Sequence, residues 1–209
     1  TGTGSNATIG HGLGSTPALI IWKNRSSSNG WIVYHHKNTS APETDYLELH
    51  ATNGTNDLNT IMNDTAPTSS VFTVGTEGAV NNSGNNFIAY CFTEKKGYSK
   101  FGTYTGNGNA DGTFVYTGFK PAFIICKRTD SADNWMMVDN KRGSINLIDE
   151  VIFSDLNQAE VSTNACDFLS NGFKARTTST WINASGGSYI YMAFAESPFV
   201  NSNGVPNNA

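Results

Sequence analysis

STPALIIWKNRSSSNGWIVYHHK (residues 15–37) and FKPAFIICKRTDSADNWMMVDNK (residues 119–141) align without a gap. Pro17 matches Pro121, and the same offset of 104 residues holds for the tryptophan and for two lysines in each stretch. Similarity at a fixed offset indicates an internal repeat. Chance similarity between strands rich in Asn and Gly does not explain an aligned proline and tryptophan. The sequence therefore predicts two copies of one module.

A second block repeats near the end of each copy. NNSGNNFIAYCFTE (residues 81–94) matches NASGGSYIYMAFAE (residues 183–196) at an offset of 102 residues, so two residues are lost in a loop between the blocks. The most charged short stretch, EKKGYSK (residues 94–100), falls between the copies. We therefore expect a first module over residues 1–96 and a second over residues 97–209.

The repeat also bears on the start of the first module. Thr1 aligns with Thr105, which follows the segment KFGTY in its own copy. No counterpart of that segment precedes Thr1 in this sequence. We expect that the first module lacks its opening segment here, and that the natural polypeptide extends upstream so that this chain is a C-terminal piece.

Strand and turn residues dominate the composition, which is heavy in Gly, Asn, Ser, Thr and aromatic residues. PALIIWKN and PAFIICKR are apolar runs bounded by turn residues, and GSYIYMAFAE alternates between two faces. No window has a clean helical period. The predicted fold is all-β, with two tandem antiparallel β-sandwich modules of jelly-roll type. The alternative is one concanavalin-like jelly roll built from the two halves.

Charge and cysteine usage exclude several classes. Charged residues make up 14% of the chain and the net charge is −4, which argues against a nucleic-acid partner. No apolar run approaches the length of a membrane span, so membrane insertion is not expected. The three cysteines have no CxxC spacing, which argues against a disulfide framework or a zinc site. Cys91 and Cys126 lie in apolar runs and are predicted to be buried thiols.

Catalytic motifs are missing from the sequence. It contains no GxSxG, HExxH, P-loop or GxGxxG pattern. Glu94 and Glu196 end equivalent strands, and a position repeated in both modules favours a structural role over catalysis. Asp130 and Asp133 in the TDSAD loop could bind calcium, but a polar hairpin tip explains them as well and is favoured. We expect no enzymatic activity, no cofactor and no metal.

Aromatic side chains are the best candidates for ligand contacts, because their rings stack on the apolar faces of sugars. Trp31 and Trp135 repeat and are therefore expected in the core. Trp22, which aligns with Cys126, and Trp181, in the polar loop TSTWINASGG, have no aromatic counterpart. Packing against the neighbouring module is the alternative for Trp181. The candidate ligand-binding residues are Trp181, Asn183, Trp22, Asp130 and Asp133.

The sequence resembles a module found in proteins described as tail-fibre or structural proteins of tailed bacteriophages. The resemblance covers most of the chain. It rests on NDTAPTSSVFTVG (residues 63–75), on residues 89–135, on DFLSNGFKAR (residues 167–176), on NASGGSYIYMAFAESPF (residues 183–199) and on the closing NSNGVPNNA.

This resemblance implies a component of the virion, an extracellular particle, with a lectin-like sandwich fold and no known activity. We expect the C-terminal part of a tail fibre that binds a host-surface glycan. Its expected partners are other virion proteins, and fibre proteins suggest by analogy a homo-oligomer, a trimer. One alternative is a capsid decoration or tail accessory protein that contacts only virion proteins. A polysaccharide depolymerase is the other.

Overall fold

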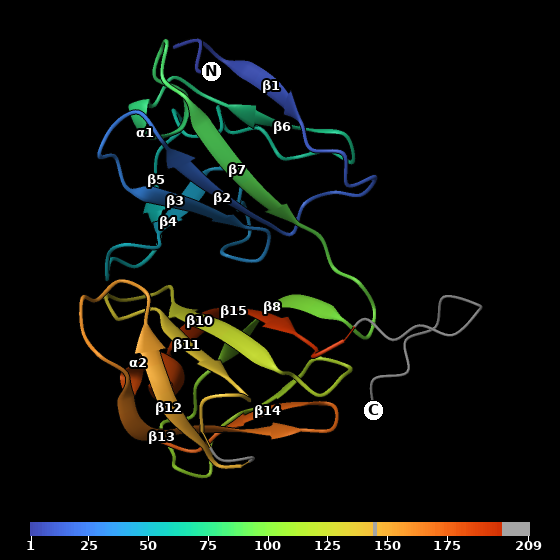
Figure 1. Ribbon diagram of the computed structural model, residues 1–209, viewed down its shortest axis with the longest axis vertical. Helices are drawn as coiled ribbons and strands as arrows, with labels where there is room; N and C mark the ends of the chain where they lie inside the picture. Colours follow the sequence, from blue (N-terminus) through green and yellow to red (C-terminus); the bar gives the residue numbers. More distant parts are fainter. Residues whose placement is uncertain (144–145, 198–209) are drawn as a thin grey trace. The chain divides into compact units, whose positions relative to one another are not determined.

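Strands form nearly all the regular structure in the described residues, 1–143 and 146–197, of this computed structural model (Figure 1). The predicted all-β fold is confirmed. Two helices of four residues each occur in the described part of the chain, and neither has the length or apolar character to cross a membrane. The chain divides into two compact units, Thr1–Thr93 and Glu94–Ala209.

The first unit holds a five-stranded sheet and a separate strand pair. Its sheet has the order β5-β4-β3-β2-β7, and β1 pairs with β6. On β2, Ile20 and Trp22 point to the core, where Trp22 meets Phe72 of β6 edge to face, with ring centroids 5.7 Å apart. The β1–β6 pair therefore covers the inner face of the sheet. The elements are β1 Ala7–Gly10, β2 Leu19–Asn24, β3 Trp31–His35, β4 Asp45–Glu48, β5 Asn56–Asp57, β6 Val71–Val74, α1 Gly78–Asn81 and β7 Phe87–Phe92.

The second unit contains one eight-stranded sheet of order β8-β15-β10-β11-β12-β13-β14-β9. The β8 end of the sheet approaches the β14–β9 end. The ring centroids of Tyr104 on β8 and Tyr191 on β15 lie 5.8 Å and 5.5 Å from that of Phe173 on β14. The sheet is thus curled nearly into a barrel around the core. The elements are β8 Ser99–Thr105, β9 Phe114–Tyr116, β10 Phe123–Arg128, β11 Met136–Asp139, β12 Ile148–Phe153, β13 Val161–Leu169, β14 Gly172–Ala175, α2 Thr180–Asn183 and β15 Ser188–Phe194.

The sequence repeat corresponds to a structural repeat. β10 lies 104 residues after β2, and α2 lies 102 residues after α1, as the alignment of the two copies requires. In both units the strand after the helix, β7 or β15, pairs antiparallel with the central strand, β2 or β10. β8 is the exception, since it has no counterpart among the strands of the first unit.

The division between the units falls at Thr93, three residues before the predicted boundary. Glu94 belongs to the second unit because its side chain is bound there. One carboxylate oxygen accepts a hydrogen bond from the backbone N–H of Phe101 at 3.2 Å, and the other forms an ion pair with Lys100 at 3.0 Å.

The three cysteines are free thiols. Cys126 and Cys166 are fully buried in the core of the second unit, whereas Cys91 on β7 is only partly buried. The prediction of a buried thiol therefore holds for Cys126, and for Cys91 in part.

Alkaline pH is expected to destabilise the second unit through Cys126. Burial raises the pKa of this thiol from 9.0 to about 12, against a smaller lowering effect of the Tyr104 hydroxyl. The folded unit therefore holds the proton where the unfolded chain releases it, and stability falls as the pH rises from 9 towards 12. In urea unfolding above pH 9, Cys126→Ala should show a shallower loss of stability with pH than the parent. Equal slopes would contradict this assignment.

Candidate functional site

Two of the five predicted ligand residues belong to the core. Trp22 is 1% exposed and packs on Phe72, while Asn183 is 0% exposed. The side-chain amide of Asn183 donates to the backbone oxygens of Asn109 and Thr177 at 2.7 Å and 2.9 Å. Both side chains are packed inside the fold, and a ligand role for either stays a prediction. Trp22 lies in the first unit and the other four residues lie in the second.

Trp181 lies on α2 and is partly buried. Its ring meets Phe153 edge to face, with centroids 5.8 Å apart, at the border of the second core. This contact gives Trp181 a packing role within its own unit. A ligand role for Trp181 stays a prediction.

The aspartates of the TDSAD loop stabilise that loop. The carboxylate of Asp130 forms an ion pair with Arg128 at 3.0 Å and accepts the backbone N–H of Ser188 at 3.0 Å. The hydrogen bond from Arg128 lowers the pKa of Asp130. Asp133 accepts the backbone N–H of Asn134 at 2.9 Å. Over residues 1–143 and 146–197, no three His, Cys, Asp or Glu side chains are grouped so that they could hold a metal ion.

An aromatic pair lies on the outer face of the sheet in the first unit. Trp31 of β3 and Tyr90 of β7 have nearly parallel rings, 19° apart, with centroids 6.5 Å from one another. Tyr90 is 43% exposed and Trp31 is partly buried. The expectation that Trp31 is a core residue is therefore wrong, although its repeat partner Trp135 is buried.

Strand register places the two rings on one face. Lys23 of β2 pairs with Trp31 on one side, and Ile21 pairs with Tyr90 on the other. Directly paired residues share a face, so both rings extend over β2 between them. Lys23 places its ammonium 5.7 Å from the centre of the Trp31 ring, a favourable cation–π distance. Trp31, Tyr90, Lys23 and Ile21 together are called the aromatic platform.

Polar groups border the aromatic platform. Lys23 donates a hydrogen bond to the backbone oxygen of Asn29, in the Ser-rich loop between β2 and β3. His50 lies beside Trp31 and accepts its backbone N–H at 3.2 Å. The imidazole lies where a Cβ at Gly30 would be, so a glycine is needed for this close approach. The platform thus combines an apolar surface with amide, hydroxyl, imidazole and ammonium groups at its border.

Chemically, such a surface can bind a sugar. The aliphatic face of a pyranose can stack on exposed rings, and neighbouring polar groups can bond its hydroxyls. The sequence does not predict the platform, because the repeat favours a core position for Trp31 and the pattern around Tyr90 indicates only a strand. One signal was available: Tyr90 aligns with Met192, so this aromatic ring is present in the first copy alone.

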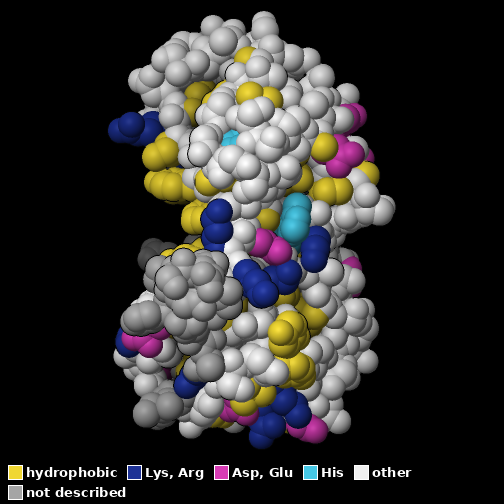
Figure 2. Space-filling view, turned by 90° about the vertical axis from the view of Figure 1, so that its right-hand side faces the viewer, with side chains coloured by type: hydrophobic (Ala, Val, Ile, Leu, Met, Phe, Trp, Pro, Cys, Tyr) yellow, Lys and Arg dark blue, Asp and Glu magenta, His cyan; other side chains and the backbone are white. Residues whose placement is uncertain are grey.

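Surface charge is mixed on the face of the molecule shown in Figure 2. Lys and Arg side chains lie among carboxylates there, and hydrophobic side chains reach the surface in both units. No continuous basic stripe is visible on that face.

The fold and the platform define a tandem all-β protein with an exposed aromatic surface. The chain belongs to the family described as domain of unknown function DUF7483, whose model matches residues 1–198 and thus extends over both units. No curated protein and no solved structure matches the chain.

Proposed function

We propose that this chain is a non-enzymatic attachment module of a tailed-phage virion, and that its aromatic platform binds a glycan of the host surface. The observation that carries the proposal is the exposed ring pair Trp31 and Tyr90. Tyr90 is 43% exposed and its ring lies nearly parallel to that of Trp31, so the two rings form one contiguous aromatic surface. The sequence resemblance to phage structural proteins supports the same function.

The composition of the platform favours a carbohydrate over a protein partner. Two rings and one isoleucine form a small apolar surface, far below the extent of a stable protein interface. The neighbouring loop, RSSSNG, offers short hydroxyl and amide side chains. Weak single-site affinity is expected from so open a surface, and the many copies of a virion protein would compensate by multivalency.

Replacing either ring should strongly weaken glycan binding. The biotinylated chain, made multivalent on streptavidin, would be applied to an array of bacterial lipopolysaccharides and capsular polysaccharides. We expect binding to at least one glycan, and a loss of about tenfold or more for Trp31→Ala and for Tyr90→Ala, because each removes one stacking surface.

The matched control is Tyr116→Ala, which removes a tyrosine that is 64% exposed in the second unit. This variant should bind like the parent. Circular dichroism would establish that all three variants are folded. Absence of binding by the folded parent to every glycan at high avidity would contradict the proposed function, and so would equal losses in the Tyr116 variant.

A further inference from the structure

β7 has one unpaired edge. It pairs with β2, with Lys23 opposite Ile88 and Ile21 opposite Tyr90. The backbone N–H of Arg25 donates a hydrogen bond to the backbone oxygen of Asn86 at 2.8 Å. This bond shows which alternate residues of β7 direct their backbone groups toward β2. The backbone groups of Phe87, Ala89 and Cys91 therefore point away from β2. In residues 1–143 and 146–197, no strand pairs with that side of β7.

The same edge is occupied in the second unit. β15, the counterpart of β7, pairs there with β8 along its whole length. Tyr191 lies opposite Gly102, and Tyr189 lies opposite Tyr104. An exposed edge of this length is a site at which another strand can add, and proteins commonly cover it.

Thr1 lies at the end of the unpaired edge. The backbone N–H of Gly2 bonds the oxygen of Asn85 at 2.7 Å, and the N–H of Gly84 bonds the oxygen of Gly2 at 3.0 Å. In the second unit the equivalent Gly106, directly after β8, makes the same two bonds to Gly187 and Gly186, both at 2.9 Å. A strand in β8's position would therefore lead straight into Thr1.

A cavity of about 190 Å³ lies where the second unit has the ring of Tyr104. In the second unit this ring stacks on Tyr189 at 4.9 Å, and its hydroxyl donates to the oxygen of Ile182 at 2.8 Å. The equivalents of these two neighbours, Phe87 and Val80, line the cavity. Its other lining residues include Thr1, Gly2, Trp22 and Ala89.

Trp22 adds an independent observation. Its indole N–H is buried and has no hydrogen-bond partner within the described part of the chain. Buried donors are nearly always paired, and the ring of Trp22 borders this cavity. An occupant with an oxygen atom would supply the missing acceptor.

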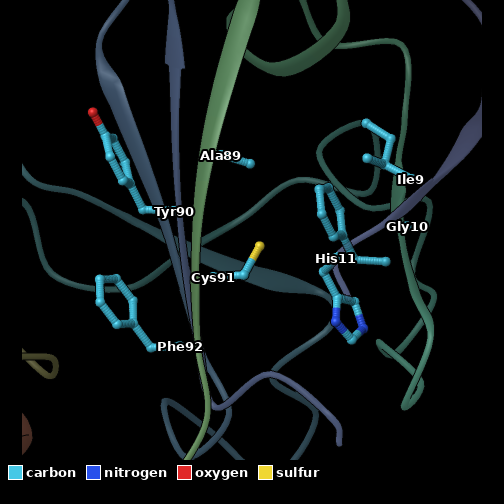
Figure 3. A pocket seen from close by; sticks show the side chains of 8 residues that line it. Ile9, Gly10, His11, Ala89, Tyr90, Cys91 and Phe92 are labelled. Carbon is cyan, nitrogen blue, oxygen red and sulfur yellow. The ribbon is translucent and has the colours of Figure 1, made fainter. Parts of the chain in front are cut away.

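A groove of about 510 Å³ continues along the same edge. Ala89 and Cys91 point into it from β7, together with Ile9 and His11, while Tyr90 points to the opposite side of the strand (Figure 3). Ile9 is 42% exposed here. The groove is thus an uncovered apolar surface that borders the unpaired backbone.

We propose that the unpaired edge of β7, with this groove and cavity, binds one antiparallel β-strand that leads directly into Thr1 and has the residue pattern of β8. An aromatic residue immediately before Thr1 fills the cavity. The third position before Thr1 corresponds to Gly102 in the second unit, three residues before Thr105. A glycine is needed there because a Cβ at Gly102 would meet the Tyr191 ring at 2.6 Å. Ala89 replaces that tyrosine in the first unit, so the strand has room for a side chain at this position.

The test adds SKFGTY, a copy of residues 99–104, directly before Thr1 of the full chain. Its tyrosine then immediately precedes Thr1. Cys91 is a partly buried thiol in the groove, and the other two cysteines are buried, so its alkylation by iodoacetamide reports on this edge. We expect alkylation of Cys91 to become about tenfold slower or more, and amide exchange of residues 87–92 to slow as well.

The matched control is YSKFGT, which has the same composition but is shifted by one residue, so that its alternate side chains face the wrong way. It should leave Cys91 as reactive as in the parent. Equal protection by both extensions, or by neither, would overturn the proposal. A third outcome would also overturn the proposal: Cys91 of the unextended chain becomes more protected as the protein concentration rises, and sedimentation shows dimers. The occupant of the edge would then be a second copy.

Discussion

Replacing Asn183 with alanine is expected to lower the free energy of unfolding of the second unit by about 3 kcal/mol, at roughly 1 kcal/mol for each of three hydrogen bonds. The side-chain oxygen of Asn183 accepts the backbone N–H of Asn107 at 3.0 Å. Its side-chain nitrogen donates to the backbone oxygens of Asn109 and Thr177. Alanine removes these three bonds to the backbone, together with the donation to the side-chain oxygen of Asn107 at 3.1 Å, and leaves space beside α2.

Asn81, the repeat partner of Asn183, offers an internal comparison. Its side-chain oxygen accepts the N–H of Thr3 at 2.9 Å, and its nitrogen donates to the oxygens of Ser5 and Gly75, both at 2.7 Å. Asn81→Ala should therefore destabilise the first unit by a similar amount. Asn157 is exposed, and Asn157→Ala is the control with little expected change.

Urea unfolding, with hydrogen exchange measured separately for peptides of each unit, would distinguish these effects. The Asn183 variant should speed exchange in the second unit and the Asn81 variant in the first. A change below about 1 kcal/mol for both would contradict a structural role of this pair.

The repeat made most of the fold predictable. A gapless match over residues 15–37 and 119–141 located the central hairpin of each unit, and alternation identified the last strand. The same repeat relates β7 to β15. It did not show that the edge left unpaired borders a groove and a cavity, because these depend on side chains brought together from β1, β6 and β7.

The candidate site was less predictable for a related reason. A tryptophan that is repeated in both copies is expected to be buried, which holds for Trp135 but not for Trp31. Trp22 lacks an aromatic counterpart, yet it fills the core. Single-sequence patterns give the face on which a side chain lies, but not what covers that face. The sequence predicts Asn183 as a ligand residue because polar residues near a tryptophan suit a sugar, whereas its burial is set by the loop around Asn107.

Tyr104→Ala is expected to destabilise the second unit by about 3 kcal/mol, the low end of the cost of removing a large aromatic side chain from a core, because its ring is partly buried. The ring stacks on Tyr189, packs against Phe173, and bonds the oxygen of Ile182. Alanine removes these contacts and leaves a cavity of the kind that the first unit already has. Tyr104→Phe keeps the ring and loses only the hydroxyl, so it should cost about 1 kcal/mol.

Tyr116→Ala is the matched control, because it removes a tyrosine that is 64% exposed in the same unit. Its effect on urea unfolding should be within about 0.5 kcal/mol of zero. If Tyr104→Ala were as mild as this control, the strand β8 would hold its place through backbone bonds alone. An aromatic residue would then be of little use to a strand on the edge of β7. A large loss would show that the ring stabilises the pairing, since the cavity beside Trp22 has the counterparts of the Tyr104 neighbours in its lining.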